Sequence, residues 1–219
     1  MPRVAIILSG CGVNDGAEIH ESVLTLLALD RMDVEVVFAA PDVGQADVVD
    51  HVTGSTCDEQ RNVLRESARI ARGVIRDLAG LSAGDVDAAI LPGGFGAAKN
   101  LSNFASGGSS WEVNPDVARF LKELHAAGKP IGAICIAPAV LAALFGGEGV
   151  TLTIGTDEGT AMRLEGQGAR HRACRVDDIV IDSDRRIVTT PAYMLAGRIS
   201  EAADGIEKLC GAVVELARC

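Results

Sequence analysis

The chain has 219 residues, of which 48% are hydrophobic, 23% charged and 3% aromatic. This is ordinary globular composition, and the length is sufficient for one domain, residues 1–219, with its own aliphatic core. The formal net charge of −10 disfavours nucleic acid and anionic membranes as partners, because both are bound through clustered lysine and arginine.

Short apolar runs alternate with helical patterns from the N-terminus to the C-terminus. The predicted strands cover residues 3–8, 34–39, 86–91, 131–134, 151–154, 178–182 and 186–190. The predicted helices cover residues 18–29, a stretch that begins at Asp58 inside the polar excursion 44–73, and residues 114–128, 137–144 and 195–216. The last two strands form a hairpin around residues 183–185.

Strands that are unbroken apolar runs and alternate with helices indicate a mainly parallel sheet that is covered on both faces. The sequence therefore predicts an α/β protein with three layers. In open α/β sheets, ligands bind outside the carboxyl ends of the strands. Three loops with unusual residues follow apolar strands here, at residues 9–16, 92–103 and 135–138. We expect the functional site where these loops converge.

Cys135 stands where a strand passes directly into a helix. Such a turn strains the backbone and points the side chain outward, as in the nucleophile elbows of hydrolases. The positive end of the next helix is expected to lower the pKa of the thiol and favour the thiolate. The alternative is a small buried core cysteine, but the placement on the turn favours a reactive nucleophile.

Two other segments carry candidate groups. Gly93 and Gly94 lie in the turn 92–96, where backbone N–H groups can approach a ligand and form an oxyanion hole; a turn with no further role is the alternative. Residues 15–21 gather acidic and imidazole groups after the first strand. These offer a carboxyl partner for the cysteine, although an acid in the first helical turn can serve only the helix dipole.

The cysteines do not form a recognisable metal or redox motif. They stand at positions 11, 57, 135, 174, 210 and 219, and no pair has Cys-x-x-Cys spacing. We therefore expect six free thiols, with neither a zinc site nor a dithiol centre. No apolar run reaches the roughly 18–20 residues of a membrane span, and the first strand is too short for a signal segment. The sequence thus predicts a cytoplasmic protein.

The sequence resembles the PfpI-type superfamily of the class I glutamine-amidotransferase-like fold. Residues 91–101 (LPGGFGAAKNL) and 132–138 (GAICIAP) carry the resemblance. It is similar, more narrowly, to the ElbB-type (enhancing lycopene biosynthesis) group of isoprenoid-biosynthesis glyoxalases. The segments shared with that group are residues 8–12 (LSGCG), 15–16, 18–21 (EIHE), 101–105 (LSNFA) and 188–196 (VTTPAYMLA).

The resemblance implies a flavodoxin-like fold and a glyoxalase-like activity that hydrates glyoxal, a small dicarbonyl, to a hydroxy acid without glutathione, metal or organic cofactor. It also implies a homodimer. The family nucleophile falls on Cys135, and the oxyanion and substrate-binding positions fall on Gly93, Gly94 and Ile136. The glutamate that contacts the cysteine falls on Glu21, with Glu18 as second choice.

The chain departs from the family pattern in its histidines. Protease-type relatives keep a histidine directly after the cysteine, and deglycase-type relatives keep one about twenty residues later; here these positions hold Ile136 and Gly155. Of the four histidines, only His20 is expected to reach the site, because it follows the first strand. Proton transfer would then fall to Glu21 or His20. His51, His125 and His171 are expected to be surface or packing residues.

The missing histidines predict slow turnover. They also leave two alternatives to the glyoxalase-like activity. The first is a redox-responsive regulatory protein in which Cys135 is oxidised to the sulfinate instead of turning over substrate. The second, glutamine amidotransfer, is weaker, because that chemistry needs a histidine partner and a synthetase domain. Protease activity is also disfavoured, because the histidine that protease-type relatives keep after the cysteine is absent.

Overall fold

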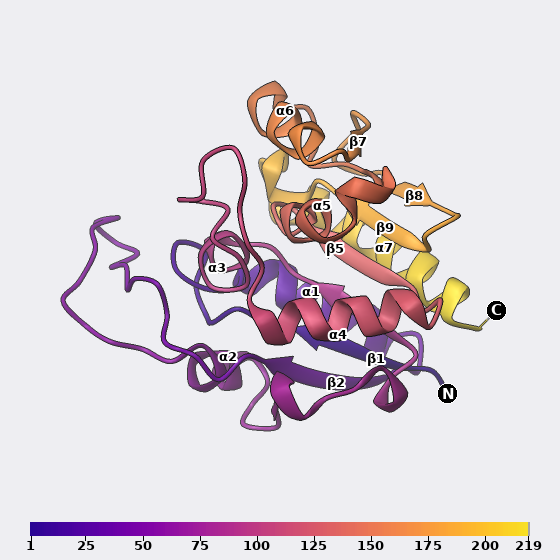
Figure 1. Ribbon diagram of the computed structural model, residues 1–219. Helices are drawn as coiled ribbons and strands as arrows, with labels where there is room; N and C mark the ends of the chain where they lie inside the picture. The colour runs from indigo at the N-terminus through magenta and orange to yellow at the C-terminus, as the bar shows by residue number, and fades with distance from the viewer. Residues whose placement is uncertain (219) are drawn as a thin grey trace.

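A seven-stranded sheet forms the centre of the computed structural model, which describes residues 1–218 (Figure 1). Its strand order is β3-β2-β1-β4-β5-β9-β8, and every neighbouring pair is parallel except β8 with β9. The strands are β1 (Arg3–Ile7), β2 (Glu35–Ala40), β3 (Arg76–Asp77), β4 (Ala88–Leu91), β5 (Ile131–Ile134), β8 (Val180–Asp182) and β9 (Ile187–Thr190). A separate pair, β6 (Thr151–Leu152) and β7 (Arg170–His171), forms a small second sheet.

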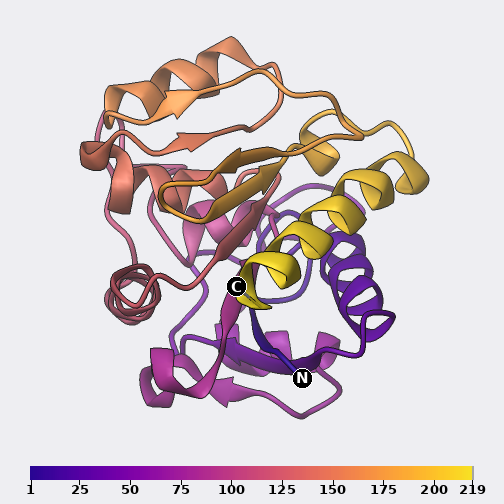
Figure 2. The same ribbon diagram turned by 90° about the vertical axis from the view of Figure 1, so that its right-hand side faces the viewer.

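Helices cover both faces of the large sheet, as Figure 2 shows edge-on. They are α1 (Ile19–Asp30), α2 (Val63–Ile70), α3 (Phe95–Lys99), α4 (Pro115–Ala126), α5 (Pro138–Phe145), α6 (Glu158–Gly166) and α7 (Ile199–Arg218). In β1, Val4 and Ile6 pack toward α1 and α7, while Ala5 and Ile7 join the cluster under α4 and α5. The predicted three-layer, flavodoxin-like α/β fold is confirmed.

The topology decides where the loops meet. The chain leaves β1 toward one edge of the sheet and returns to β4 on the other side of β1, so the strand order reverses between these two strands. At such a reversal the connections diverge and leave a crevice outside the carboxyl ends of the strands. The loop after β1, the turn after β4 and the turn after β5 all open at this edge.

Several predicted elements differ from the structure. Helix α2 begins at Val63 and not at Asp58, because the extended Asn62 caps it by accepting from the Arg65 N–H at 3.0 Å. Residues 41–62 instead form the arm that projects in Figure 1. The strand predicted over 151–154 ends at Leu152, and the last helix begins at Ile199, four residues later than expected.

Two short helices were not predicted. Helix α3 opens directly on the glycine-rich turn, and α6 begins where the Asp157 side chain accepts from the Thr160 N–H at 2.7 Å. The hairpin of β8 and β9 around residues 183–185 is confirmed. Within residues 1–218, no helix is both long and apolar enough to cross a membrane.

The cysteines within the described residues are free thiols, as predicted. They are Cys11, Cys57, Cys135, Cys174 and Cys210. Cys219 lies outside the described residues.

Two glycines of α7 give a matched test of its packing. A Cβ on Gly205 would lie 2.5 Å from the Val176 carbonyl oxygen, whereas a Cβ on Gly211 meets nothing within 4 Å. We expect Gly205→Ala to destabilise the fold by about 1–3 kcal/mol through overpacking. Gly211→Ala should stabilise it by about 0.5–1 kcal/mol through helix propensity. Urea unfolding of both variants measures the difference, and equal effects would contradict this packing.

Candidate active site

Cys135 occupies a strained turn between β5 and α5. Its φ is +61°, a left-handed conformation that costs a non-glycine residue about 1–3 kcal/mol. The Cys135 N–H donates to the carbonyl oxygen of Thr190 at 3.0 Å, which ties the turn to the end of β9. The side chain is buried but not sealed, with 8% of its surface exposed. The elbow expected from the sequence is therefore present.

Two backbone N–H groups are directed at the Cys135 sulfur. They belong to Gly94, in the turn after β4, and to Ile136, the next residue along the chain. Gly94 has φ +89°, and a Cβ there would lie 2.5 Å from the carbonyl oxygen of Gly16. Only glycine fits this close approach. The arrangement offers two donors to an oxygen that develops beside the sulfur, the geometry of an oxyanion hole.

Gly93 lies in the site but contributes differently from Gly94. Its N–H donates to Oε2 of Glu21 at 2.8 Å, so this donor is already engaged. A Cβ at position 93 would lie 2.5 Å from the Cβ of Cys135 and 2.8 Å from the Glu21 carboxylate. Gly93 thus lets the carboxyl and the thiol approach each other, and the free donors are those of Gly94 and Ile136.

Glu21 is the carboxyl group that contacts Cys135. It projects from α1 with no exposed surface, accepts from the N–H groups of Gly93 and Tyr193, and shares a hydrogen bond with the thiol. Burial, together with the nearby charge of Glu18, raises the pKa of Glu21 to about 8. At neutral pH this carboxyl is therefore mostly protonated.

The thiol does not have the lowered pKa that its place before a helix suggests. Burial raises the pKa of Cys135 well above its ordinary value, and the charge of Glu21 raises it further, against the two N–H donors that lower it. Desolvation outweighs the weak field of the eight-residue helix α5. Because two buried acids in contact cannot both be charged, Glu21 and Cys135 hold at least one proton between them.

Glu18, the second choice for the carboxyl partner, has another position. It is the N-cap of α1, and its Oε2 accepts from the Glu21 N–H at 2.6 Å. It therefore orients the first turn of α1 and places a negative charge near Glu21. The contact with the thiol belongs to Glu21 alone of the two.

His51, His125 and His171 have surface or packing positions, as the sequence analysis expects. The assignment of His20 to proton transfer stays a prediction. His20 is exposed at the start of α1, with Nδ1 2.8 Å from the hydroxyl of Tyr193. The other three have partners elsewhere: His51 contacts Val49 and Asn14, His125 pairs with Glu148, and His171 accepts from the N–H of Ile154.

The segment after β9 supplies the site residues that the sequence analysis missed. Tyr193, the single tyrosine of the chain, donates its backbone N–H to Oε1 of Glu21 at 3.3 Å. Leu195 packs so close to Gly155 that a Cβ there would lie 2.9 Å from the Leu195 Cγ. Position 155 therefore has no room for a histidine side chain. One feature of the sequence could have indicated that this segment belongs to the site: it directly follows a predicted strand.

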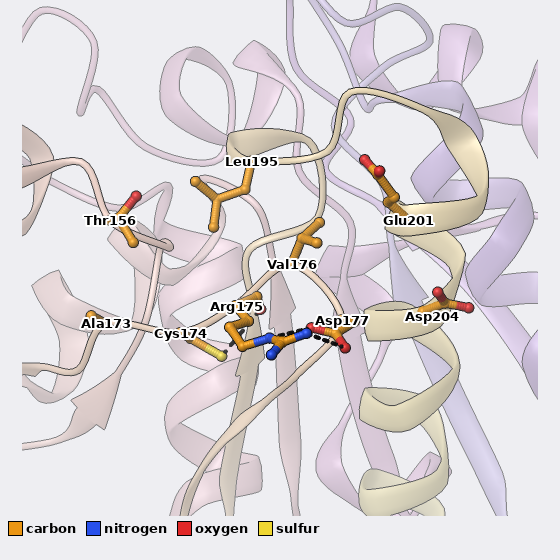
Figure 3. Close-up of a pocket in the computed structure, with 9 residues that line it drawn as sticks. All are labelled: Thr156, Ala173, Cys174, Arg175, Val176, Asp177, Leu195, Glu201 and Asp204. Carbon is orange, nitrogen blue, oxygen red and sulfur yellow. Dashed lines mark hydrogen bonds and ion pairs between the residues drawn. The ribbon is translucent and has the colours of Figure 1, made fainter.

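Another concavity, drawn in Figure 3, has Leu195 in its lining. It has a volume of about 660 Å³ between the segment 173–177, Thr156 and the start of α7. None of the predicted site residues lines it. Its one thiol, Cys174, has a pKa that is raised by burial and by the carboxylates of Asp178 and Asp177. The pocket thus contains no activated nucleophile.

Comparisons with known proteins identify the family of this chain. Residues 11–196 match the model of the DJ-1/PfpI family. The human protein named "Glutamine amidotransferase-like class 1 domain-containing protein 3, mitochondrial" is 49% identical, over 98% of this chain and 83% of its own. The zebrafish "ES1 protein, mitochondrial" is 33% identical, over 88% of this chain and 77% of its own.

A solved structure shares nearly the whole fold. The "isoprenoid biosynthesis protein with amidotransferase-like domain" of Ehrlichia chaffeensis superposes with a TM-score of 0.93 at 37% identity and covers 99% of both chains. The names of the human and zebrafish relatives contradict the cytoplasmic location predicted from the sequence, because both are mitochondrial proteins. The shortness of the apolar runs was thus no basis for assigning a compartment.

The raised pKa of Glu21 predicts a pH-dependent stability. Folding lifts this pKa from 4.5 to about 8, so the native state binds more protons than the unfolded state between those values. The contribution of Glu21 to stability is then fully present below pH 4.5 and is lost as the pH rises through 8. Between pH 5 and 8.5 the wild type should lose about 3–5 kcal/mol relative to Glu21→Gln. Urea unfolding across this range measures it; parallel profiles would contradict the raised pKa.

Proposed function

The chain belongs to the DJ-1/PfpI family, and we propose that it is a glutathione-independent, glyoxalase-like enzyme that converts glyoxal to glycolate through Cys135. The observation that carries the proposal is the thiol of Cys135 on a strained turn, with the N–H groups of Gly94 and Ile136 and the carboxyl of Glu21 directed at its sulfur. The reaction needs no metal or organic cofactor.

The first step forms a hemithioacetal. The Cys135 sulfur bonds to one aldehyde carbon of glyoxal, and the carbonyl oxygen takes a proton. Glu21, mostly protonated at neutral pH, supplies that proton and receives the one that the thiol gives up. The N–H groups of Gly94 and Ile136 stabilise the charge on the oxygen as it develops.

The second step moves a proton between the two carbons. A base removes the proton from the sulfur-bearing carbon while the neighbouring aldehyde oxygen takes a proton, which gives an enediol. The neighbouring carbon then gains a proton as the hydroxyl on the sulfur-bearing carbon loses its own, which yields a thioester of glycolate. Glu21 and His20 are the groups assigned to this transfer. Water then cleaves the thioester and restores the thiol, so that glyoxal and one water become glycolic acid.

The same electrostatics imply slow turnover and a small substrate. A base must be deprotonated, yet the pKa of Glu21 is about 8, and the pKa of the thiol is raised as well. Only 8% of the Cys135 surface is exposed, which favours compact dicarbonyls such as glyoxal and methylglyoxal. A link to isoprenoid biosynthesis is supported by the name of the Ehrlichia protein.

Replacing Cys135 tests the proposal directly. Cys135→Ala should abolish conversion of glyoxal to glycolate, and Glu21→Gln should lower kcat by about 10²-fold or more through the lost acid–base group. Cys174→Ser removes a buried thiol elsewhere and serves as the matched control, with unchanged turnover expected. Glycolate is measured by chromatography. Turnover by Cys135→Ala at the wild-type rate would overturn the proposal.

A redox-responsive regulatory protein is the second candidate. The lack of a histidine at position 155 favours it, because that lack limits turnover. The cradle of N–H groups could also hold the oxygens of a sulfinate. A gain of two oxygens at Cys135 after mild peroxide, with negligible glycolate formation by the wild type, would favour this role over catalysis.

A homodimer is proposed as the assembly. Three apolar residues of α1, Ile19, Val23 and Leu27, lie exposed at four-residue spacing, while its buried face carries Glu21, Ser22, Thr25, Ala28 and Leu29. An exposed apolar stripe of this kind is typical of an interaction surface, and two copies of α1 can cover each other around a twofold axis.

A charge in this stripe should separate the copies. Val23→Lys is expected to give a monomer, because a lysine at the centre of an apolar contact loses hydration without gaining a partner. Met162→Lys, at an exposed methionine of α6, is the control and should leave the assembly unchanged. Light scattering after size exclusion measures the mass. A dimer in both variants would place the interface elsewhere.

A further inference from the structure

Tyr193 contacts two consecutive residues of α1. Its backbone N–H donates to the buried carboxylate of Glu21 at 3.3 Å, and its hydroxyl lies 2.8 Å from Nδ1 of the exposed His20. Successive residues of an α-helix point about 100° apart, so a residue from another element must lie across the end of α1 to reach both. Tyr193 therefore connects the buried and the solvent-facing sides of the site.

The chain holds Tyr193 firmly in this position. It lies in a tight turn, Ala192–Met194, that follows β9, and the preceding Ala192 is buried with φ +41°. The turn is closed by the N–H groups of Leu195 and Ala196, which donate to the carbonyl oxygen of Ala192 at 3.0 and 2.9 Å. Leu195, seen beside Thr156 in Figure 3, packs on Gly155 and anchors the far end.

His20 depends on Tyr193 for its orientation. An exposed imidazole samples several rotamers, and ordering it costs conformational entropy. The hydrogen bond to the hydroxyl and the ring contact, with centroids 5.8 Å apart, restrict that freedom. Partial burial and the charges of Glu18 and Glu21 raise the pKa of Tyr193, so its hydroxyl keeps its own proton at neutral pH. The hydroxyl oxygen can then accept from an N–H on Nδ1, and in that tautomer Nε2 keeps a lone pair that can take a proton.

We propose that Tyr193 is the positioning residue of this site, orienting Glu21 through its amide and His20 through its hydroxyl so that the two groups can share the proton transfers. This inference rests on the proposed function. In thioester hydrolysis, the water oxygen bonds to the carbonyl carbon and its proton goes to Nε2 of His20. The C–S bond breaks, its electron pair stays on sulfur, the sulfur takes a proton from Glu21, and His20 returns one to Glu21.

The test compares Tyr193→Phe, His20→Gln and the double variant with the wild type. Phenylalanine keeps the ring and the amide, so only the hydroxyl contact is lost. We expect Tyr193→Phe to lower kcat about tenfold with KM within twofold, and His20→Gln to lower it about 10²-fold. The double variant should be no slower than His20→Gln, because the hydroxyl acts through the imidazole. His125→Gln, at the distant pair with Glu148, should match the wild type.

A spectroscopic signature separates positioning from general stability. The ¹⁵N spectrum of the His20 imidazole should show Nδ1–H in the wild type and a mixture of tautomers in Tyr193→Phe. Three results would each overturn this role while leaving glyoxal turnover by the wild type intact. They are a wild-type kcat in Tyr193→Phe, an unchanged His20 tautomer in that variant, and a double variant whose loss of kcat equals the product of the two single losses. A wild type without turnover would instead overturn the proposed function, and this inference with it.

Discussion

The contact between the Glu21 carboxyl, the Gly93 N–H and the Cys135 side chain is the constraint on which the site depends. It brings the start of α1, the end of β4 and the end of β5 to one point, with only 2.5 Å between Cys135 Cβ and the place where a Gly93 Cβ would stand. Such proximity is reached only with positive φ at Cys135 and Gly94. The parallel sheet beneath holds these strained residues in place.

That contact also determines the electrostatics. A carboxyl and a thiol are buried against each other, so desolvation raises the pKa of both, and neither the N–H donors nor the helix end reverses this. The result is a site that retains a proton at neutral pH. Such a pair can donate a proton to a substrate oxygen when the sulfur adds to the carbonyl. The same raised pKa values leave only a small fraction of Cys135 as thiolate in the resting state.

The acidic segment 15–21 divides into three separate functions. Asp15 is buried, and its carboxylate accepts from the N–H of Val49 at 2.8 Å, which anchors the arm formed by residues 41–62. Glu18 caps α1, and Glu21 faces the thiol. These carboxylates look equivalent in the sequence. Their positions relative to the start of α1 and the turn after β4 give each a different role. Asp15 anchors the arm, Glu18 caps the helix and Glu21 is the partner of the nucleophile.

The sequence by itself determined the α/β class, the parallel strands and the elbow at Cys135, because apolar runs and strand-to-helix turns are local patterns. It also indicated Glu21, Gly93 and Gly94 through resemblance to a family. Only the tertiary structure decided that the Gly93 N–H serves Glu21, that the thiol pKa is raised, and that Tyr193 lies across His20 and Glu21. Burial, and contacts such as that between Glu21 and Tyr193, which are 172 positions apart, arise only when the sheet assembles. They therefore cannot be predicted from a local pattern in the sequence.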